Sequence, residues 1–298
     1  MMKKALAASL AATMLLTSGV TVFADRVDAV IDKPYLALGA DLTPQEQMTV
    51  LSLLGLEDIN VDDYDIISIT NADEHEYLDK YLDASIIGTR ALSSVLVVGK
   101  EAGNGINVTT KNISYCTEGM YRNALLTAGI EDADITVAGP FSISGTAALV
   151  GAIKAYETMT GEEIADENLD AANDELVLTG KLVEDIGDSE KAEDLMALVK
   201  QEVAENKLTS AEDIQNVVDQ ACDQLDIQLS EENQQQIAEL MKKIEGLDLD
   251  VDKLKDQAKD LYQKLEDLDF HVDKESVGNF FTRIIDAIVN FFQGLFGK

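Results

Sequence analysis

The sequence is poor in several residue types that particular protein classes need. Its 298 residues include no tryptophan, three prolines, two cysteines and two histidines. Three prolines exclude a proline-rich stalk, and two cysteines exclude a small scaffold held by several disulfides. Because 46% of the residues are apolar, the chain has enough hydrophobic material for a globular core, and extensive disorder is not expected.

Basic residues are also few. The chain has 23 Lys and Arg against 56 Asp and Glu, which gives a formal net charge of −33. Nucleic-acid binding is not expected, since phosphate contacts need clustered basic side chains. The same charge opposes strong electrostatic attraction to an anionic membrane. It does predict a diffuse atmosphere of divalent cations around the protein.

The first residues predict export. Lys3 and Lys4 precede an apolar stretch over 5–16, and Val22-Phe23-Ala24 fits the small-x-small rule of a signal peptidase site. The apolar stretch is too short to span a bilayer, and no cysteine at the cleavage point indicates a lipid anchor. We therefore expect residues 1–24 to be a signal peptide and the mature protein to be secreted or associated with the cell envelope.

Residues 25–160 combine β-rich runs with helical periods. Between the expected elements lie helix starts and stops such as Thr43-Pro44-Gln45-Glu46 and Gly55. This pattern predicts an α/β (α+β) domain with one mixed sheet, in which strands joined through helices are parallel. The glycine-rich loop 99–105 predicts a hairpin of the strands on either side. The expected strands are 35–38, 65–70, 94–98, 106–110 and 135–138, and the expected helices are 44–54, one capped by Asn71 with Tyr77, Leu78, Tyr81 and Leu82 on one face, 117–128 and 145–158.

The strand signal ends near residue 160. Residues 161–276 predict an acidic all-α domain with amphipathic helices. Helix starts are expected at the capping sequences beginning at Thr160 and Thr209, and at Ser230. The expected helices are 163–186, 189–206, 210–226, 231–245 and 250–268, followed by 277–296.

Several stretches of the first half resemble a known family. They are Thr70–Glu74, Gly88–Ser94, Tyr121–Ile130 and Ser142–Gly151, spread over about 70–155. Together they are similar to the YpuA-like family of secreted bacterial proteins, catalogued as domain of unknown function 1002. The resemblance implies an exported protein of Gram-positive type with an α/β region and a helical remainder. It implies no activity and supplies no catalytic residues.

Two polar clusters are candidate ligand-binding elements. Thr89 and Arg90 lie at the entry of an expected strand, where a cation beside hydroxyls suits a carboxylate or a sugar. A salt bridge from Arg90 to one of the many acids is the simpler interpretation. Ser142, Ser144 and Thr146 lie between a strand and a helix, where backbone N–H groups and hydroxyls suit an anion. Helix capping with close packing is the alternative there.

No set of residues indicates catalysis. His75 is flanked by acids, and Cys116 lies near a helix start, where the helix dipole lowers a thiol pKa, but no motif brings the two together. We expect no catalytic residue, metal or cofactor. The run that begins at Asp248 resembles a calcium-binding loop, yet Lys253 replaces its required glycine. Cys116 and Cys222 either pair across the two halves or remain buried thiols.

The C-terminal segment 277–298 is strongly amphipathic. Its apolar side chains follow helical spacing, with polar residues such as Arg283 and Asp286 on the other side. Such a face packs on the helical domain, joins copies into a homo-oligomer, binds a partner or lies on a membrane surface. The candidate contact residues are Phe280, Phe281, Ile284, Ile288, Phe291, Phe292 and Phe296.

These features give three functional hypotheses. The leading one is a secreted, non-enzymatic binding or structural module whose partner is a component of the cell envelope. The second is a hydrolase acting on an envelope polymer or peptide, because carboxylates are abundant. The third is a peripheral membrane protein that docks through 277–298.

Overall fold

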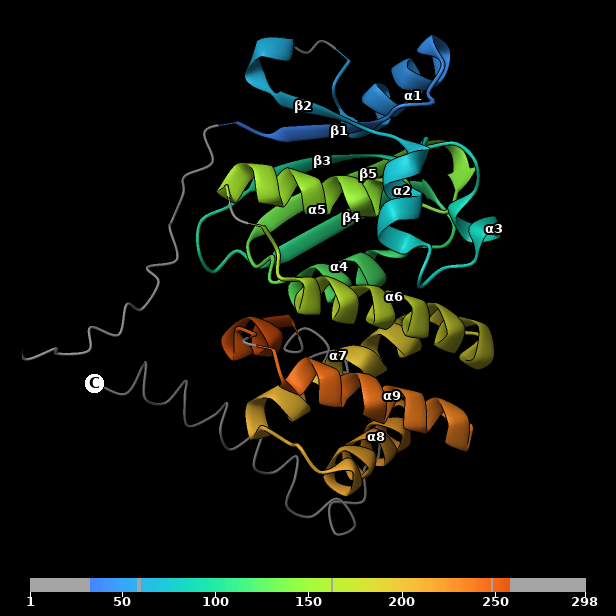
Figure 1. Cartoon of the computed structure of the whole chain (residues 1–298), viewed down its shortest axis with the longest axis vertical. Helices are drawn as coiled ribbons and strands as arrows, with labels where there is room; N and C mark the ends of the chain where they lie inside the picture. Colours follow the sequence, from blue (N-terminus) through green and yellow to red (C-terminus); the bar gives the residue numbers. More distant parts are fainter. Residues whose placement is uncertain (1–32, 58–59, 162, 248, 258–298) are drawn as a thin grey trace, which may run out of the picture.

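A computed structural model describes residues 33–57, 60–161, 163–247 and 249–257 (Figure 1). The predicted signal peptide and the C-terminal segment 277–298 lie outside these residues. The predicted mixed sheet is confirmed, and its strand order is β2-β1-β3-β5-β4. The strands are β1 (Tyr35–Gly39), β2 (Asp65–Ile69), β3 (Ser94–Gly99), β4 (Ile106–Ile113) and β5 (Ala133–Ile143).

Four strands run in one direction and β3 runs in the other. The predicted parallel relationship holds for β1 and β2, joined through α1 (Pro44–Leu54), and for β4 and β5, joined through α4 (Glu118–Thr127). It is wrong for β2 and β3. Their connection contains only the eight-residue α2 (Asn71–Leu78) and the four-residue α3 (Ala84–Ile87). The chain stays at one end of the sheet and enters β3 from there.

The predicted hairpin of β3 and β4 is also wrong, because β5 lies between them. β5 pairs antiparallel with β3 and parallel with β4. It has 11 residues, far more than the four expected, and Ala133, Ile135 and Val137 are buried on its inner face. The loop after β3 therefore crosses two strand spacings, about 10 Å, which a tight turn cannot do.

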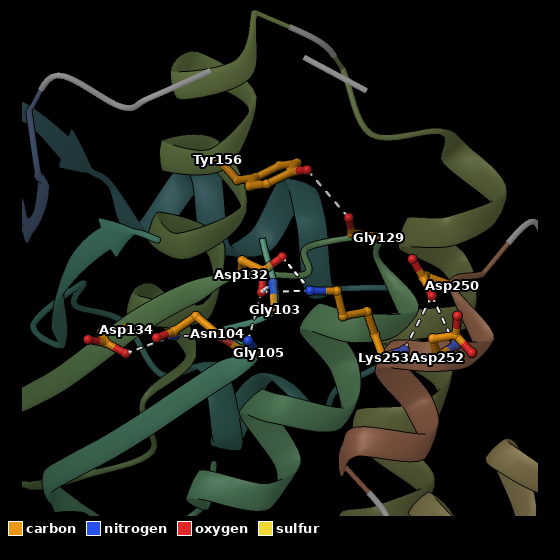
Figure 2. Close-up of polar contacts among 10 residues, drawn as sticks. All are labelled: Gly103, Asn104, Gly105, Gly129, Asp132, Asp134, Tyr156, Asp250, Asp252 and Lys253. Atoms are coloured by element: carbon orange, nitrogen blue, oxygen red, sulfur yellow. Dashed lines mark hydrogen bonds and ion pairs between the residues drawn. The ribbon is translucent and has the colours of Figure 1, made fainter. Parts of the chain in front are cut away.

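The backbone of the glycine-rich loop is hydrogen-bonded to the carboxylate of Asp132 (Figure 2). The backbone N–H groups of Gly103 and Gly105 donate to Asp132 Oδ1 at 3.0 and 2.7 Å. Lys253 Nζ donates to both oxygens of Asp132, at 2.7 and 2.5 Å. Lys253 belongs to a helical stretch, 251–257, whose first turn is capped by Asp250 Oδ1. The calcium-loop-like run thus starts a helix that is fastened to the glycine-rich loop.

Helices cover the two faces of the sheet unequally (Figure 1). On one face, α5 (Thr146–Thr160) packs across β1, β2 and β3, with α2 beside α5 and α4 beside β4. This face holds a large core in which Gly151 lies against Ala37, Val95 and Ile69. On the other face, α1 covers a smaller core around Leu36, Val50 and Ala138.

Several predicted helix starts shift by one or a few residues. The capping box at Thr43 and the cap at Ser230 are confirmed. Thr70, rather than Asn71, caps α2, and this helix ends at Leu78, so Tyr81 and Leu82 lie beyond it. Thr160 closes α5 instead of opening the next helix, and Ser210 rather than Thr209 caps α8.

Beyond α5 the described chain is helical. Helix α4 contacts the sheet through β4 and also packs on α6 and α7. A second large core joins α6 to α9 and contains Cys222, while Cys116 lies in the first core. Both cysteines are buried and free. The helices are α6 (Asp166–Ile186), α7 (Ser189–Asn206), α8 (Ala211–Leu225) and α9 (Glu231–Glu245).

Candidate functional site

A pocket of about 480 Å³ opens at the end of the sheet where the four parallel strands finish. Helices α2, α4 and α5 begin at this end, because each follows one of those strands directly. In open α/β sheets, ligands bind at the carboxyl ends of the strands, where helix N-termini point inward. The pocket therefore has the position that this architecture favours for a ligand.

The pocket unites the two polar clusters that the sequence singled out. Thr89 and Arg90, from the loop before β3, line it together with Ser144 and Thr146, from the turn between β5 and α5. Ser142 is exposed on β5 and is not among the lining residues. The two clusters, more than 50 positions apart in sequence, thus form one candidate site, with Ser142 left outside it.

A buried carboxyl group forms part of the pocket wall. Glu74 of α2 is 1% exposed, and its Oε1 accepts a hydrogen bond from Thr146 Oγ1 at 2.6 Å. Asn71 Nδ2 donates to Oε2 at 3.1 Å. Burial raises the pKa of Glu74, while the hydrogen bonds from Thr146 and Asn71 act in the opposite direction. Thr146 also lies 3.2 Å from the hydroxyl of Ser144, so the acid and two hydroxyls form one network.

The start of α5 is capped by a residue from the loop before β3. Gly145 precedes the helix at φ +101° and provides no side-chain cap. Ser93 instead accepts the N–H of Ala148 at 2.9 Å. Since Ser93 is 3% exposed and lines the pocket, it fixes the helix start against the loop that carries Thr89 and Arg90.

Two aromatic side chains complete the wall. Phe141, near the end of β5, is 49% exposed, and Tyr115 follows β4. The hydrogen bond from Ser114 N–H to Ile143 O, at 2.8 Å, holds the ends of β4 and β5 together. Burial raises the pKa of Tyr115 to about 12, and its ring packs against Gly180 of α6. The pocket wall is therefore supported by the helical half of the chain.

Arg90 is already engaged by protein groups. Its Nη2 donates to the carbonyl of Asp41 at 2.8 Å and to Glu46 Oε2 at 3.0 Å. The predicted salt bridge to an acid is thus present. Arg90 reaches the pocket as part of a hydrogen-bonded corner between α1 and the loop before β3.

The structure does not support a cysteine–histidine pair. Cys116 is fully buried, and this burial raises the pKa of its thiol to about 12, opposite to the lowering predicted from its place near a helix start. Tyr121 lies against it and donates to the carbonyl of Gly145 at 2.6 Å. His75 is directed to Asp79, with Nδ1 and Oδ1 2.5 Å apart.

Sequence reasoning included Ser93 in the cluster with Thr89 and Arg90, but it missed three residues that shape the pocket: Glu74, Tyr115 and Phe141. Glu74 had a usable signal, because it lies four positions before Leu78 and hence on the same helix face. Tyr115 and Phe141 follow strand runs without a distinctive motif. Only the register of β4 and β5 brings them to the same end of the sheet.

The described part of the chain shows neither a metal-binding cluster nor a membrane-spanning helix. Within it, no three His, Cys, Asp or Glu side chains gather in a way that could hold a metal ion. Its helices also include none that is both long and apolar enough to cross a bilayer.

The sheet and pocket define an α/β protein with a ligand-sized cavity at the strand ends. Comparison with known proteins then gives the family: the chain belongs to the family described as protein of unknown function (DUF1002), whose model matches residues 38–261. A protein of Bacillus subtilis (strain 168), named "Uncharacterized protein YpuA", is 39% identical over 298 residues, which cover 98% of this chain and 100% of the relative. No solved structure matches the chain. The family match includes α6 to α9 and so extends well beyond the stretches that carried the resemblance.

Proposed function

We propose that this protein is an exported, non-enzymatic binding module of the cell envelope, and that its pocket binds a neutral sugar unit of an envelope polymer. The observation that carries the proposal is the pairing of Tyr115 and Phe141 with the hydroxyls of Ser93, Ser144 and Thr146 around one cavity. Sugar rings present apolar C–H faces that pack on aromatic side chains, and hydroxyls at their rim that exchange hydrogen bonds.

The charges of the pocket favour a neutral ligand over an anion. The carboxyl of Glu74 lies beside Thr146, at the start of α5, where an anion would have to bind. Arg90, the cation of the pocket lining, is neutralised by Glu46. The carboxylate ligand suggested by Arg90 in the sequence is therefore the weaker candidate.

The proposal assigns different roles to the two halves of the chain. Residues 25–160 form the binding domain, and the acidic helical domain 161–276 spaces or assembles it. The packing of Tyr115 against Gly180 supports a contribution of the helical part to the shape of the pocket.

Hydrolysis of the same polymer is the second candidate. Glu74 supports it, because a buried carboxyl with a raised pKa suits a general acid. Glycoside hydrolysis ordinarily needs a second carboxylate, however, and Glu74 is the one acid among the described residues that line the pocket.

Calorimetric titration of the mature protein with a tetramer of β-1,4-linked N-acetylglucosamine tests binding. We expect saturable binding that Phe141→Ala weakens by about fivefold, since loss of one aromatic contact costs roughly 1 kcal/mol. Met48→Ala is the matched control, because Met48 is an exposed apolar side chain, 64% accessible, outside the pocket.

The same samples separate the alternatives. Binding of inorganic phosphate that disappears in Arg90→Gln, with no binding of the saccharide, would contradict the sugar proposal. Release of shorter saccharides that stops in Glu74→Gln would replace the binding function by hydrolysis. Cell fractionation tests export, and retention of the mature protein in the cytosol would contradict it.

A further inference from the structure

The two edges of the sheet are built differently: among the described residues no strand pairs with the outer edge of β2, and the short helical turn Val61–Asp63 lies beside its start (Figure 1). All five residues of β2 pair with β1 in unbroken parallel register. Asp65 N–H donates to the carbonyl of Pro34 at 3.0 Å, and the carbonyl of Ile69 accepts Ala40 N–H at 2.8 Å. In a parallel ladder the bonded residues alternate. The N–H and C=O groups of Ile66 and Ser68 therefore point away from β1, towards the free edge.

The opposite edge carries features that block strand addition. At β4 the register shifts between Lys111 and Ile113, and Asn112 adopts φ +60°. Helix α4 also packs beside this strand. Bulges, lysines and covering helices are the usual devices that protect a sheet edge.

β2 has no bulge and no lysine over its own length, and α5 packs on its face without pairing with its outer edge. It contains no proline, lysine or arginine, and its register is regular. Ile66 is 44% exposed, and Ser68 is also exposed. A regular edge strand with an exposed apolar side chain is a template for another extended chain.

The surroundings of β2 indicate the charge of such a chain. Asp62, Asp63 and Asp65 lie at its start, and the sequence has no lysine or arginine between positions 62 and 79. Lys33 reaches this cluster from outside that range, where its Nζ donates to the carbonyl of Asp62 at 2.7 Å, so the three carboxylates still outnumber the nearby cation. A second copy of this protein would bring another net charge of −33 to the same edge. A basic segment would instead be attracted to it.

We propose that the β2 edge binds an extended, basic segment of a partner protein by strand addition. Backbone hydrogen bonds to Ile66 and Ser68 provide the affinity, the side chain of Ile66 contacts an apolar residue of the partner, and the three aspartates favour lysine or arginine beside it. β2 contributes no residue to the pocket. This interaction is therefore independent of the sugar proposal.

Two fluorescent peptides test the proposal on the mature protein: Lys-Lys-Val-Thr-Val-Thr-Val and its Glu-Glu counterpart. We expect the lysine peptide to bind at least about tenfold more tightly, with an advantage that shrinks as salt is added. Hydrogen exchange should show protection of the amides of Ile66 and Ser68 on binding. Equal affinity of the two peptides, or unprotected amides, would overturn the proposal.

Variants of Ser68 test whether peptide binding depends on the backbone N–H of β2 or on side chains. Ser68→Pro removes an outward N–H without touching the bonds to β1, and should weaken the lysine peptide about tenfold or more. Ser68→Ala keeps the N–H and should bind like the wild type. If Ser68→Pro misfolds, Ile66→Lys reverses the local preference and should abolish the advantage of the lysine peptide. Dimerisation that Ser68→Pro or Ile66→Lys abolishes would identify a second copy as the occupant and overturn the proposal.

Discussion

Glu175 of α6 and Lys200 of α7 form an ion pair with both side chains completely buried, and their Oε1 and Nζ atoms are 3.0 Å apart. Lys200 Nζ also donates to the carbonyl of Asn123, at 2.9 Å, and to Thr127 Oγ1, at 3.1 Å. Asn123 and Thr127 belong to α4, the helix that packs beside the sheet. One ammonium group thus joins three helices at the contact between the two halves of the described chain.

Replacement of Lys200 by methionine should destabilise the protein severely. The substitution leaves Glu175 buried without its counter-charge, which costs about 3–5 kcal/mol in comparable sites. Urea denaturation followed by circular dichroism measures this loss. The double variant Lys200→Met, Glu175→Met is the control and should recover much of the lost stability. A single variant within about 1 kcal/mol of the wild type would show that the pair contributes little.

The stability of the protein should depend on the protonation of Glu202. Burial raises the pKa of this side chain to about 8, and the neighbouring Glu205 adds to the shift. Asn206 and Lys255 act in the opposite direction, and Oε1 of Glu202 is buried without a hydrogen-bond partner among the described residues. The folded state therefore holds a proton more tightly than the unfolded state, whose pKa is near 4.5.

Such a group contributes its full stabilisation below the unfolded pKa and loses it as pH rises towards 8. The wild type should lose at most about 1.4 kcal/mol per pH unit from this source between about pH 5 and 8. Urea titrations across that range should show a flatter profile for Glu202→Gln. Glu239→Gln, on the surface of α9, should leave the profile unchanged. Parallel profiles for the wild type and Glu202→Gln would contradict the assignment.

Gly145 should tolerate no side chain. It has φ +101°, and a Cβ there would lie 2.7 Å from the hydroxyl oxygen of Tyr121 and 2.8 Å from Ile113. Gly145→Ala should destabilise the protein by about 2–5 kcal/mol through backbone strain and overpacking. Gly161 is the matched control: it has φ +70°, and a methyl group there would meet no atom of the described residues within 4 Å. Its alanine variant should therefore lose only about 1 kcal/mol. Thermal denaturation of both variants measures these losses of stability. Equal losses for Gly145→Ala and Gly161→Ala would refute the steric argument.

Gly180→Ala should affect the pocket more than the fold. A methyl group there meets the ring of Tyr115, 2.5 Å from its hydroxyl oxygen, and must displace it. Alanine favours a helix interior by about 1 kcal/mol over glycine, which offsets part of the strain. We expect little change in urea stability but weaker binding of the N-acetylglucosamine tetramer. Unchanged affinity would mean that Tyr115 does not contribute to the ligand site.

Local sequence signals predicted the helices and strands better than they predicted which strands pair with each other. The caps at Thr43 and Ser230 specify helix starts through neighbours three residues away, so they can be read from sequence. The order of β3, β5 and β4 depends on pairing between distant segments. The glycine-rich loop gave a false hairpin signal, because its N–H groups bind Asp132, 29 positions after Gly103, instead of closing a turn.

The candidate site was predictable in its polar parts alone. Thr89, Arg90, Ser144 and Thr146 stood out as hydroxyl and cation clusters at strand ends, and they do share a pocket. Glu74 was overlooked among 56 acidic residues, since its spacing from Leu78 indicates a shared helix face but not that α5 covers this face. Its burial follows from the crossing of α2 and α5, which is a property of the tertiary structure.

The double role of α4 has a practical consequence for anyone cutting the chain at residue 160 to obtain the sheet by itself. That fragment would retain α4 but lose Lys200, leaving the carbonyl of Asn123 and the hydroxyl of Thr127 without the ammonium that both contact. It would also lose Lys253, the cation bound to Asp132 beneath the glycine-rich loop. A shortened version for crystallisation or spectroscopy should therefore keep both Lys200 and Lys253, which lie well beyond the boundary suggested by the change in composition.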